Sequence, residues 1–300
     1  MRADTEIKIV EVGPRDGLQS EPYTVPTSIK VELIGRLADA GLTVIETTSF
    51  VSDQAIPQLS DAESVYGRLN RRDGIRYPAL VPNERGYERA LQAGITDIAV
   101  FTAASEAFNQ HNINCSIEES MARFAPVIER AQSDGVTVRG YVSTVMGCPY
   151  QGDVPLADVV RVCEALYSAG CYEISLGDTI GVGNARQAQT LIRSVSQSIP
   201  IDRLAIHFHD TYGQALANIF ACLELGVTTI DSSVAGLGGC PYARGATGNV
   251  ATEDVIYMLD GMGLDTGVDL WALAQTGRWI AAELGRPHSR AGQAVLKTRR

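Results

Sequence analysis

Eight short runs of β-branched and other apolar residues recur along the chain, and segments with helical periodicity separate them. Segments 27–41 and 155–170 carry apolar residues at helical spacing and end in glycine, the usual residue just past a helix C-terminus. Apolar strands that alternate with helices are typical of parallel sheets. Eight such units predict an α/β fold, a (β/α)8 TIM barrel. The runs are 7–13, 43–50, 75–82, 97–105, 136–144, 172–179, 204–211 and 228–236.

An open, doubly wound parallel sheet is the alternative architecture. It usually has fewer strands, and no G-x-G-x-x-G motif opens the first helical segment here. Because the chain has no low-complexity segment and no linker, we expect one catalytic domain over residues 1–300. The barrel is expected over about residues 6–265, followed by a C-terminal helical extension and tail over about 266–300. That extension has an amphipathic pattern suited to capping the barrel or pairing with another subunit.

The net charge and the termini restrict the partners and the compartment. A formal net charge of −10 disfavours nucleic acid and anionic membranes as partners. No run approaches the roughly 18 unbroken apolar residues of a membrane span. The N-terminus enters a strand pattern at once, without room for a signal or transit segment, which predicts a cytoplasmic protein. The six cysteines form no C-x-x-C pair, so a disulfide framework is not expected.

Polar residues collect where the predicted strands end. In a barrel of this kind, functional groups gather at the C-terminal ends of the strands and in the loops that follow. These positions are therefore the candidate functional residues. They are Arg15, Asp16 and Gln19 after the first run, Glu46 and Ser49 in the second, Asp178 in the sixth, His207, His209 and Asp210 in the seventh, and Cys240, Arg244 and Asn249 after the eighth.

His207 and His209 form a His-x-His pair, and side chains two apart in a strand share one face. Both rings can therefore point at one ion. Asp16 and Asn249 follow neighbouring strands of a closed barrel and can add oxygen ligands. Such a set suits a divalent cation, Mg²⁺ or Mn²⁺ first and Zn²⁺ as the alternative. The competing interpretation is that the two histidines fill the barrel interior or join a hydrogen-bond network.

Four other candidates have a functional and a structural interpretation each. Arg15 suits an oxyanion, because guanidinium is always charged and offers a bidentate fork, and the competing interpretation is a surface ion pair with Asp16 in a turn. Glu46 fits a supporting role, holding Arg15, and Asp178 is either a functional or a buried core carboxylate. Glycines surround Cys240, so its loop is typical of a lid that closes over a site, and the alternative is an ordinary loop thiol.

Seven stretches together resemble the 3-hydroxy-3-methylglutaryl-CoA lyase family, from about residue 6 to 265. The resemblance implies a (β/α)8 barrel with a divalent metal at its mouth. It also implies an acyl-CoA substrate and a homodimer or larger homo-oligomer. The stretches are VEVGPRDGLQSE, VIETTSFVS, NINCSIEES, RGYVSTVMGCPYQG, CYEISLGDTIGVG, HFHDTYGQALANI and VAGLGGCPYARGATGNVATEDVIYML.

The activity implied is a retro-Claisen cleavage of 3-hydroxy-3-methylglutaryl-CoA to acetyl-CoA and acetoacetate, a step of leucine degradation. By this resemblance Arg15 stabilises the enolate oxygen, Cys240 closes over the substrate and takes part in proton transfer, and Asp178 belongs to the acid–base machinery. The identity of the base stays open, as does whether Cys240 or a histidine returns the final proton. The resemblance also implies four metal ligands, which are Asp16, His207, His209 and Asn249. It implies that Glu46 supports the catalytic groups and that His207 takes part in catalysis. The substrate contacts that it implies are Gln19, Ser49, Arg15 and Arg244.

Three departures from the family pattern leave the CoA contacts and the acyl specificity open. They are the stretch SEPYTVPT, the pair Gln110–His111 where lysine is common, and Arg244. The first alternative function is therefore cleavage of a related 3-hydroxy-3-alkylglutaryl-CoA with a longer branch. A Claisen-type synthase is a second, and a non-catalytic CoA- or metal-binding barrel is the alternative from another class.

Overall fold

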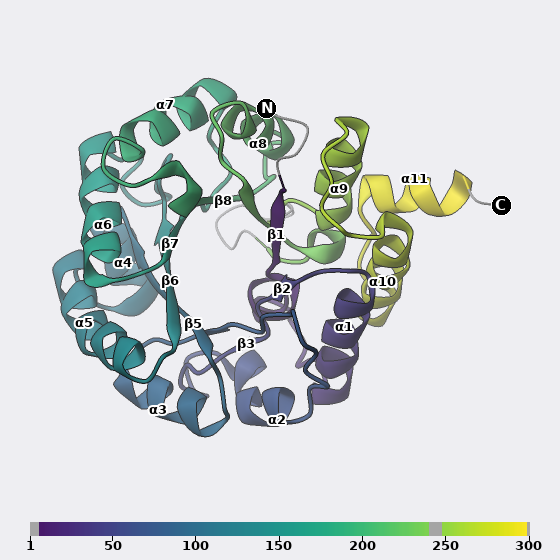
Figure 1. The fold of residues 1–300 in the computed structure, drawn as a ribbon, viewed down its shortest axis with the longest axis horizontal. Coiled ribbons are helices and arrows are strands. Elements are labelled where there is room, and N and C mark those ends of the chain that lie inside the picture. The colour runs from purple at the N-terminus through teal and green to yellow at the C-terminus, as the bar shows by residue number, and fades with distance from the viewer. Residues whose placement is uncertain (1–5, 240–247, 299–300) are drawn as a thin grey trace.

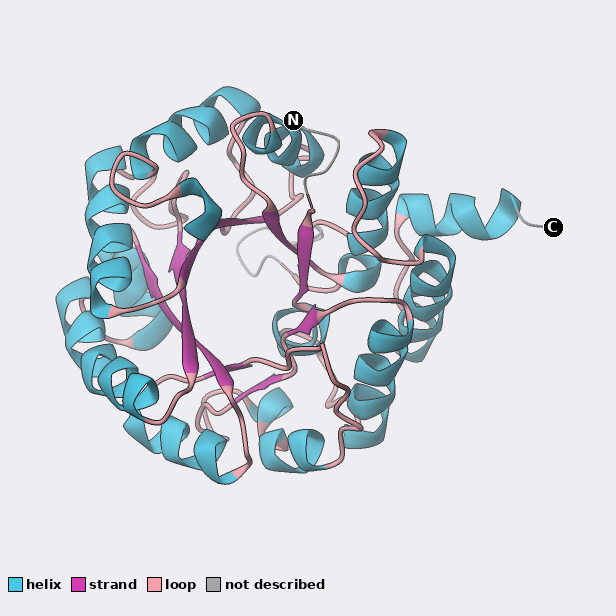
Figure 2. Cartoon of the chain, viewed as in Figure 1, coloured by secondary structure: helices cyan, strands magenta, loops and turns pink. Residues whose placement is uncertain are grey.

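Parallel strands form a ring that helices surround on the outside (Figure 2). The computed structural model describes residues 6–239 and 248–298, and within them every strand of the sheet runs parallel to its neighbours. The predicted parallel α/β barrel is therefore confirmed. The strands are β1 (Lys8–Glu11), β2 (Val44–Ile45), β3 (Thr48–Ser49), β4 (Ala79–Leu80), β5 (Asp97–Ala103), β6 (Thr137–Ser143), β7 (Glu173–Asp178), β8 (Leu204–Phe208) and β9 (Thr229–Ser232).

The barrel closes through one interrupted strand. We expected a single strand over 43–50, but it is divided into β2, which pairs with β1, and β3, which pairs with β4. Between them, the Glu46 N–H donates to the Glu11 carbonyl and the Thr47 N–H to the Pro78 carbonyl. The chain thus changes partner within two residues and joins the two ends of the sheet. The barrel has eight strand positions, as expected, although nine strands are counted.

The helices lie outside the ring, and local signals set their ends. Ser116 and Glu119 form a capping box at the start of α5, and Gly170, with a φ of 113°, ends α6. The last two helices, α10 and α11, pack beside α1 and α9 (Figure 1). The helices are α1 (Thr27–Asp39), α2 (Ala62–Gly67), α3 (Glu84–Gln92), α4 (Glu106–Ile113), α5 (Ile117–Ser133), α6 (Leu156–Ala169), α7 (Ala185–Val195), α8 (Ala215–Leu223), α9 (Thr252–Gly261), α10 (Leu270–Glu283) and α11 (Arg290–Thr298).

The interior of the barrel is polar along one side, while the apolar core fills the layer between sheet and helices. Buried charged side chains of β6, β7 and β9 face one another inside the ring, among them Arg139, Glu173 and Asp231. In most (β/α)8 barrels, by contrast, branched apolar side chains fill the interior. This polar interior lies beneath the candidate site. No described helix has the length and apolar character that a membrane crossing requires.

Candidate metal centre

A tight turn after β1 carries Arg15 and Asp16 over the mouth of the barrel. The N–H groups of Arg15, Asp16 and Gly17 all point at the Val12 carbonyl, at 3.2, 2.8 and 3.1 Å. A Cβ on Gly17 would lie 2.7 Å from the Ser233 hydroxyl, so only glycine lets this turn pack so closely against the segment after β9. The turn therefore places two charged side chains beside the end of β8.

Asp16, His207 and His209 converge at this point. Each offers one ligand atom, and these atoms all lie within 4.8 Å of one another. His207 lies in β8, and His209 directly follows Phe208, the last residue of that strand. The centroids of the two imidazole rings are 5.5 Å apart. His209 is buried, and its Nδ1 has no hydrogen-bond partner among the described residues. A cation would supply the partner that this nitrogen lacks.

The protonation states favour a cation. Burial, with a contribution from His207, lowers the pKa of His209 to about 4, so its ring is neutral at pH 7 and keeps a lone pair. Burial alone would raise the pKa of Asp16, but Arg15, His207 and His209 outweigh it and lower the pKa to about 2. A neutral imidazole beside an ionised carboxylate is the chemistry that divalent metals bind.

Asn249 lies beside Asp16 and His209 at the edge of the cluster. It pairs with His209 in an isolated antiparallel bridge, and its Nδ2 donates to Asp16 Oδ2 at 2.7 Å and to the Leu237 carbonyl at 3.2 Å. A 180° rotation of the amide would present its oxygen to the cluster, since the two amide atoms differ little in shape. The four predicted ligands are thus brought together, and their donor set fits a divalent ion.

Arg15 is held between two carboxylates. Its Nε donates to Glu46 Oε2 at 2.8 Å and its NH1 to Asp16 Oδ1 at 2.7 Å. The Tyr141 hydroxyl donates to Glu46 Oε2 at 3.3 Å, and burial raises the pKa of Glu46 even though Arg15 opposes the rise. The predicted contact between Glu46 and Arg15 is therefore present, and it fixes the guanidinium next to the candidate metal ligands.

A cavity of about 680 Å³ opens over these groups. Arg15, Asp16, Gln19, His207 and His209 line it on one side, and Leu80, Phe101, Phe108 and Tyr141 give it apolar walls. Cavities of a few hundred Å³ with convergent polar groups are typical small-molecule sites.

Other predicted residues lie elsewhere. Asp178 is buried, and its carboxylate accepts hydrogen bonds from the backbone N–H groups of Val182, at 3.2 Å, and Gly183, at 2.9 Å. These hydrogen bonds support the turn after β7, and Asp178 is not among the residues that line the cavity, so its assignment to the acid–base machinery stays a prediction. Ser49 is also buried and absent from the cavity wall. Cys240 and Arg244 lie outside the described residues.

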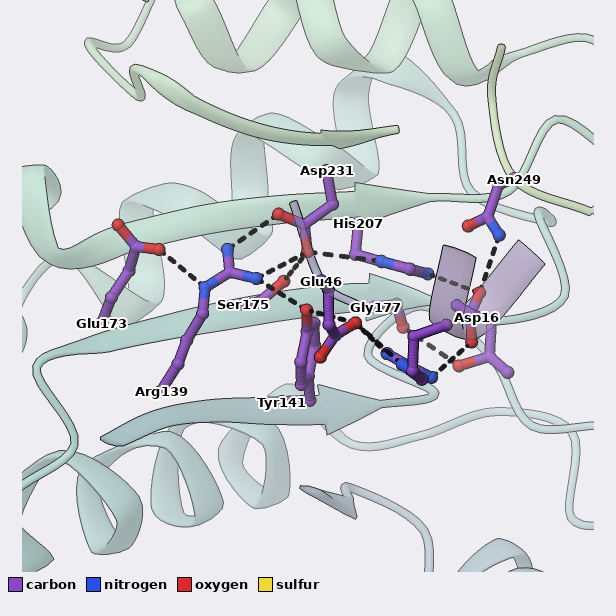
Figure 3. A network of polar contacts seen from close by, with 12 residues as sticks. Asp16, Glu46, Arg139, Tyr141, Glu173, Ser175, Gly177, His207, Asp231 and Asn249 are labelled. Carbon is purple, nitrogen blue, oxygen red and sulfur yellow. Dashed lines mark hydrogen bonds and ion pairs between the residues drawn. The ribbon is translucent and has the colours of Figure 1, made fainter. Parts of the chain in front are cut away.

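A network beneath the cavity was not predicted (Figure 3). Asp231 accepts from Arg139 NH2 at 2.7 Å and from the Ser175 hydroxyl at 2.7 Å, and its Oδ2 lies 3.3 Å from His207 Nδ1. Arg139 Nε also donates to Glu173 at 2.7 Å. The signal that would have identified these residues is a charged side chain within an apolar strand run, as in VRGYV and TIDSS.

The fold and site together define a (β/α)8 barrel with an Asp–His–His cluster and an arginine at its mouth. The HMGL-like family model matches residues 6–280, and this chain belongs to that family.

Similar proteins agree with this membership. The chain is 55% identical to "3-hydroxy-3-methylglutaryl-CoA lyase, cytoplasmic" of Rattus norvegicus over 98% of this chain and 86% of the relative. It is 53% identical to "3-hydroxy-3-isohexenylglutaryl-CoA/hydroxy-methylglutaryl-CoA lyase" of Pseudomonas aeruginosa over 99% of both. A crystal structure of hydroxymethylglutaryl-CoA lyase from Pseudomonas aeruginosa matches with a TM-score of 0.96 at 53% identity, over 98% of both chains.

Proposed function

We propose that this protein cleaves 3-hydroxy-3-methylglutaryl-CoA into acetyl-CoA and acetoacetate by a retro-Claisen reaction. The observation that carries the proposal is the position of Arg15 in the same cavity wall as Asp16, His207 and His209. One cavity thus holds groups for a cation and a fixed guanidinium for a developing negative charge. The names of the relatives support the same substrate.

The metal proposed is Mg²⁺ or Mn²⁺, with Zn²⁺ as the alternative, held by Asp16, His207, His209 and Asn249. When bound, such a cation polarises and orients a hydroxyl and a carboxylate oxygen of the substrate. Its identity is a proposal from the mixed nitrogen and oxygen donor set.

Individual residues of the chain are proposed to carry out the remaining steps of the reaction. A base accepts the proton of the C3 hydroxyl while the C2–C3 bond breaks, so that C3 becomes a ketone carbon and the electron pair leaves with C2 as a thioester enolate. Asp178 is proposed as part of this acid–base machinery. Arg15 is placed to stabilise the charge on the enolate oxygen. Glu46 holds Arg15 in that position. We propose that Cys240 takes part in protonating C2, with His207 as the alternative donor. The proposed substrate contacts, besides Arg15, are Gln19, which lines the cavity, and Ser49 and Arg244.

A longer branch at C3 of the substrate is the second candidate. The apolar walls formed by Leu80, Phe101 and Phe108 favour it, because an alkyl branch needs apolar surface. The Pseudomonas relative's name includes an isohexenylglutaryl ester. Rates measured side by side with methyl and isohexenyl esters distinguish the two: a higher kcat/KM for the isohexenyl ester would replace the methyl ester as the proposed substrate.

The direct test is release of acetyl-CoA and acetoacetate by the purified protein. We expect activity with Mg²⁺ or Mn²⁺ and loss of activity with EDTA, restored by adding either ion. No cleavage of any branched glutaryl-CoA ester by folded, metal-loaded protein would contradict the proposal and favour a non-catalytic barrel.

We also propose, on the sequence alone, a single catalytic domain, a homodimer or larger homo-oligomer, and the cytoplasm as compartment. Light scattering after size exclusion measures the assembly, and a mass of one chain would contradict an oligomer.

A further inference from the structure

Asp231 lies within hydrogen-bond distance of three side chains inside the barrel. Arg139 approaches through two nitrogens, NH2 to Oδ1 at 2.7 Å and NH1 to Oδ2 at 3.0 Å. The Ser175 hydroxyl donates to Oδ2 at 2.7 Å, and His207 Nδ1 lies 3.3 Å from the same oxygen. Asp231 is buried, with 2% of its surface exposed. Figure 3 shows its carboxylate between Arg139 and His207.

These contacts decide which nitrogen of His207 carries the proton. Arg139 donates to both oxygens of Asp231, and Ser175 donates to one of them, which is the arrangement of an ionised carboxylate paired with a guanidinium. An ionised carboxylate only accepts hydrogen bonds, so the nitrogen that faces it must donate. His207 is then protonated on Nδ1. Its other nitrogen, Nε2, carries the lone pair and lies 3.9 Å from Asp16 Oδ2.

His209 differs from His207 in this respect. Its Nδ1 has no partner among the described residues, so no carboxylate of that part of the chain orients the ring through this nitrogen. The two histidines of the cluster are thus supported unequally.

We propose that Asp231 is a positioning residue for the metal centre: it holds His207 as the Nδ1–H tautomer and so directs the Nε2 lone pair at the cation. Arg139 and Ser175 hold Asp231 in turn. Carboxylates that accept from a ligating histidine fix its tautomer and orientation, and their loss typically weakens metal binding by 10–100-fold. The inference rests on the metal site proposed above.

The tautomer is measurable without any metal. In metal-free protein labelled with ¹⁵N-histidine, long-range ¹H–¹⁵N correlation at pH 8 distinguishes Nδ1–H from Nε2–H rings, and the His207→Gln variant identifies the signals of His207. We expect Nδ1–H in the wild type. An Nε2–H ring would overturn the proposal, whatever the variants do.

Metal affinity is the second measurement. The electron paramagnetic resonance signal of free Mn²⁺ gives the Kd, and circular dichroism checks the fold. We expect Asp231→Asn to raise the Kd by about 10–100-fold, and the matched control Ser175→Ala, which removes one donor to Asp231 without touching His207, to change it less than about threefold. An unchanged Kd in folded Asp231→Asn would overturn the positioning role. Wild-type protein that binds no Mn²⁺ would instead contradict the metal site itself, while the tautomer would still be read from the metal-free spectrum.

Discussion

Two groups of polar side chains lie inside the barrel, one above the other, and they differ in how completely they are paired. The lower group, here called the inner network, consists of Lys8, Arg139, Glu173, Ser175 and Asp231, and each of these side chains is hydrogen-bonded within the group. The upper group, here called the mouth cluster, consists of Arg15, Asp16, Glu46, His207 and His209. In it, Glu46 Oε1 and His209 Nδ1 are buried without a partner among the described residues.

This difference in pairing distinguishes a network that supports the structure from a cluster that forms a functional site. A buried polar atom without a partner costs about 1–3 kcal/mol, so a folded protein retains one mainly where something else supplies the partner. The mouth cluster is incomplete in this sense and faces the cavity, whereas the inner network is complete and lies beneath it. We therefore expect changes in the mouth cluster to act on function, and changes in the inner network to act first on stability and positioning.

The largest effect is expected from His209→Ala, which removes a proposed ligand whose Nδ1 has no partner among the described residues. The variant should lose measurable turnover and most of its affinity for Mn²⁺ in a calorimetric titration, with a native circular dichroism spectrum. His111→Ala is the matched control, because His111 lines the same cavity but lies outside the cluster, and its Mn²⁺ affinity should be unchanged. Full activity of metal-free His209→Ala with chelator present would end the metal hypothesis.

Arg15→Met should lower kcat by about 10²–10³-fold with a much smaller change in KM. The reason is that Arg15 is asked to stabilise charge that appears only in the transition state. Steady-state kinetics with saturating metal measure both constants. An unchanged kcat with a raised KM would instead assign Arg15 to substrate anchoring.

Cys240→Ser should keep the fold and lower kcat by about 10²-fold, because a hydroxyl is a far weaker acid than a thiol. The other five cysteines, Cys115, Cys148, Cys163, Cys171 and Cys222, are buried. Burial also raises the pKa of Cys171 and of Cys222 to about 12, so few of their thiols are ionised at pH 8.

Alkylation followed by peptide mapping should therefore find one fast thiol, at Cys240, which acyl-CoA and metal protect. A fast label on any buried cysteine, or a fully active Cys240→Ser variant, would remove this residue from the proton transfer.

The order of elements was predictable because the signals are local. Apolar runs, helical periodicity and terminal glycines reveal where strands and helices alternate, and eight alternations imply the barrel. The run 75–82 forms a strand only at Ala79–Leu80, besides an isolated bridge between Arg76 and Val44, and the prolines at 78 and 82 limit the ladder because they lack an N–H group. The division of the second strand depends on bonds from Glu46 to Glu11 and from Thr47 to the third run, which a local pattern does not contain.

The mouth cluster was predictable for a related reason: the period of two in a strand puts His207 and His209 on one face, and barrel closure brings Asp16 and Asn249 beside them. The surroundings of Asp178 were not predictable, because backbone N–H groups of a loop donate to its carboxylate and no sequence pattern marks those donors. Asp231 was missed because its importance comes from a pairing with Arg139, 92 residues away.

Arg139→Met should test the inner network through stability. Removing this guanidinium leaves Glu173 and Asp231 as buried carboxylates without their shared cation. Breaking a buried ion pair in this way costs about 3–5 kcal/mol, which corresponds to a fall in Tm of roughly 5–8 °C for a domain of this size. Scanning calorimetry measures it, with Arg161→Met on the exposed surface of α6 as control. A Tm within 1–2 °C of wild type would mean that the network supports the fold far less than its geometry indicates.

The smallest effect concerns a buried acid, Glu253, that, unlike Asp231, has no arginine or lysine beside it among the described residues. His288 Nδ1 lies 3.6 Å from Glu253 Oε1, but this nitrogen accepts from the Ser289 N–H and burial lowers the pKa of His288, so the neutral ring is favoured. Glu253 accepts from the Ala235 N–H through both oxygens, at 3.1 and 2.9 Å, and burial raises its pKa to about 8. In the unfolded chain the group titrates near its model value of 4.5, so between about pH 5 and pH 8 the folded state holds more protons. The free energy of unfolding therefore falls as the pH rises through this window, and stays level above it.

Glu253→Gln keeps the shape and one acceptor oxygen but does not titrate, so its Tm should vary less between pH 5 and pH 8 than the Tm of the wild type. At pH 8 the Tm values of the two proteins should differ by a few degrees at most. Exposed Glu283→Gln should retain the wild-type profile. Identical profiles for wild type and Glu253→Gln would show that burial without a cation leaves this carboxyl group unperturbed, and the contrast between paired and unpaired acids would then fail at this position.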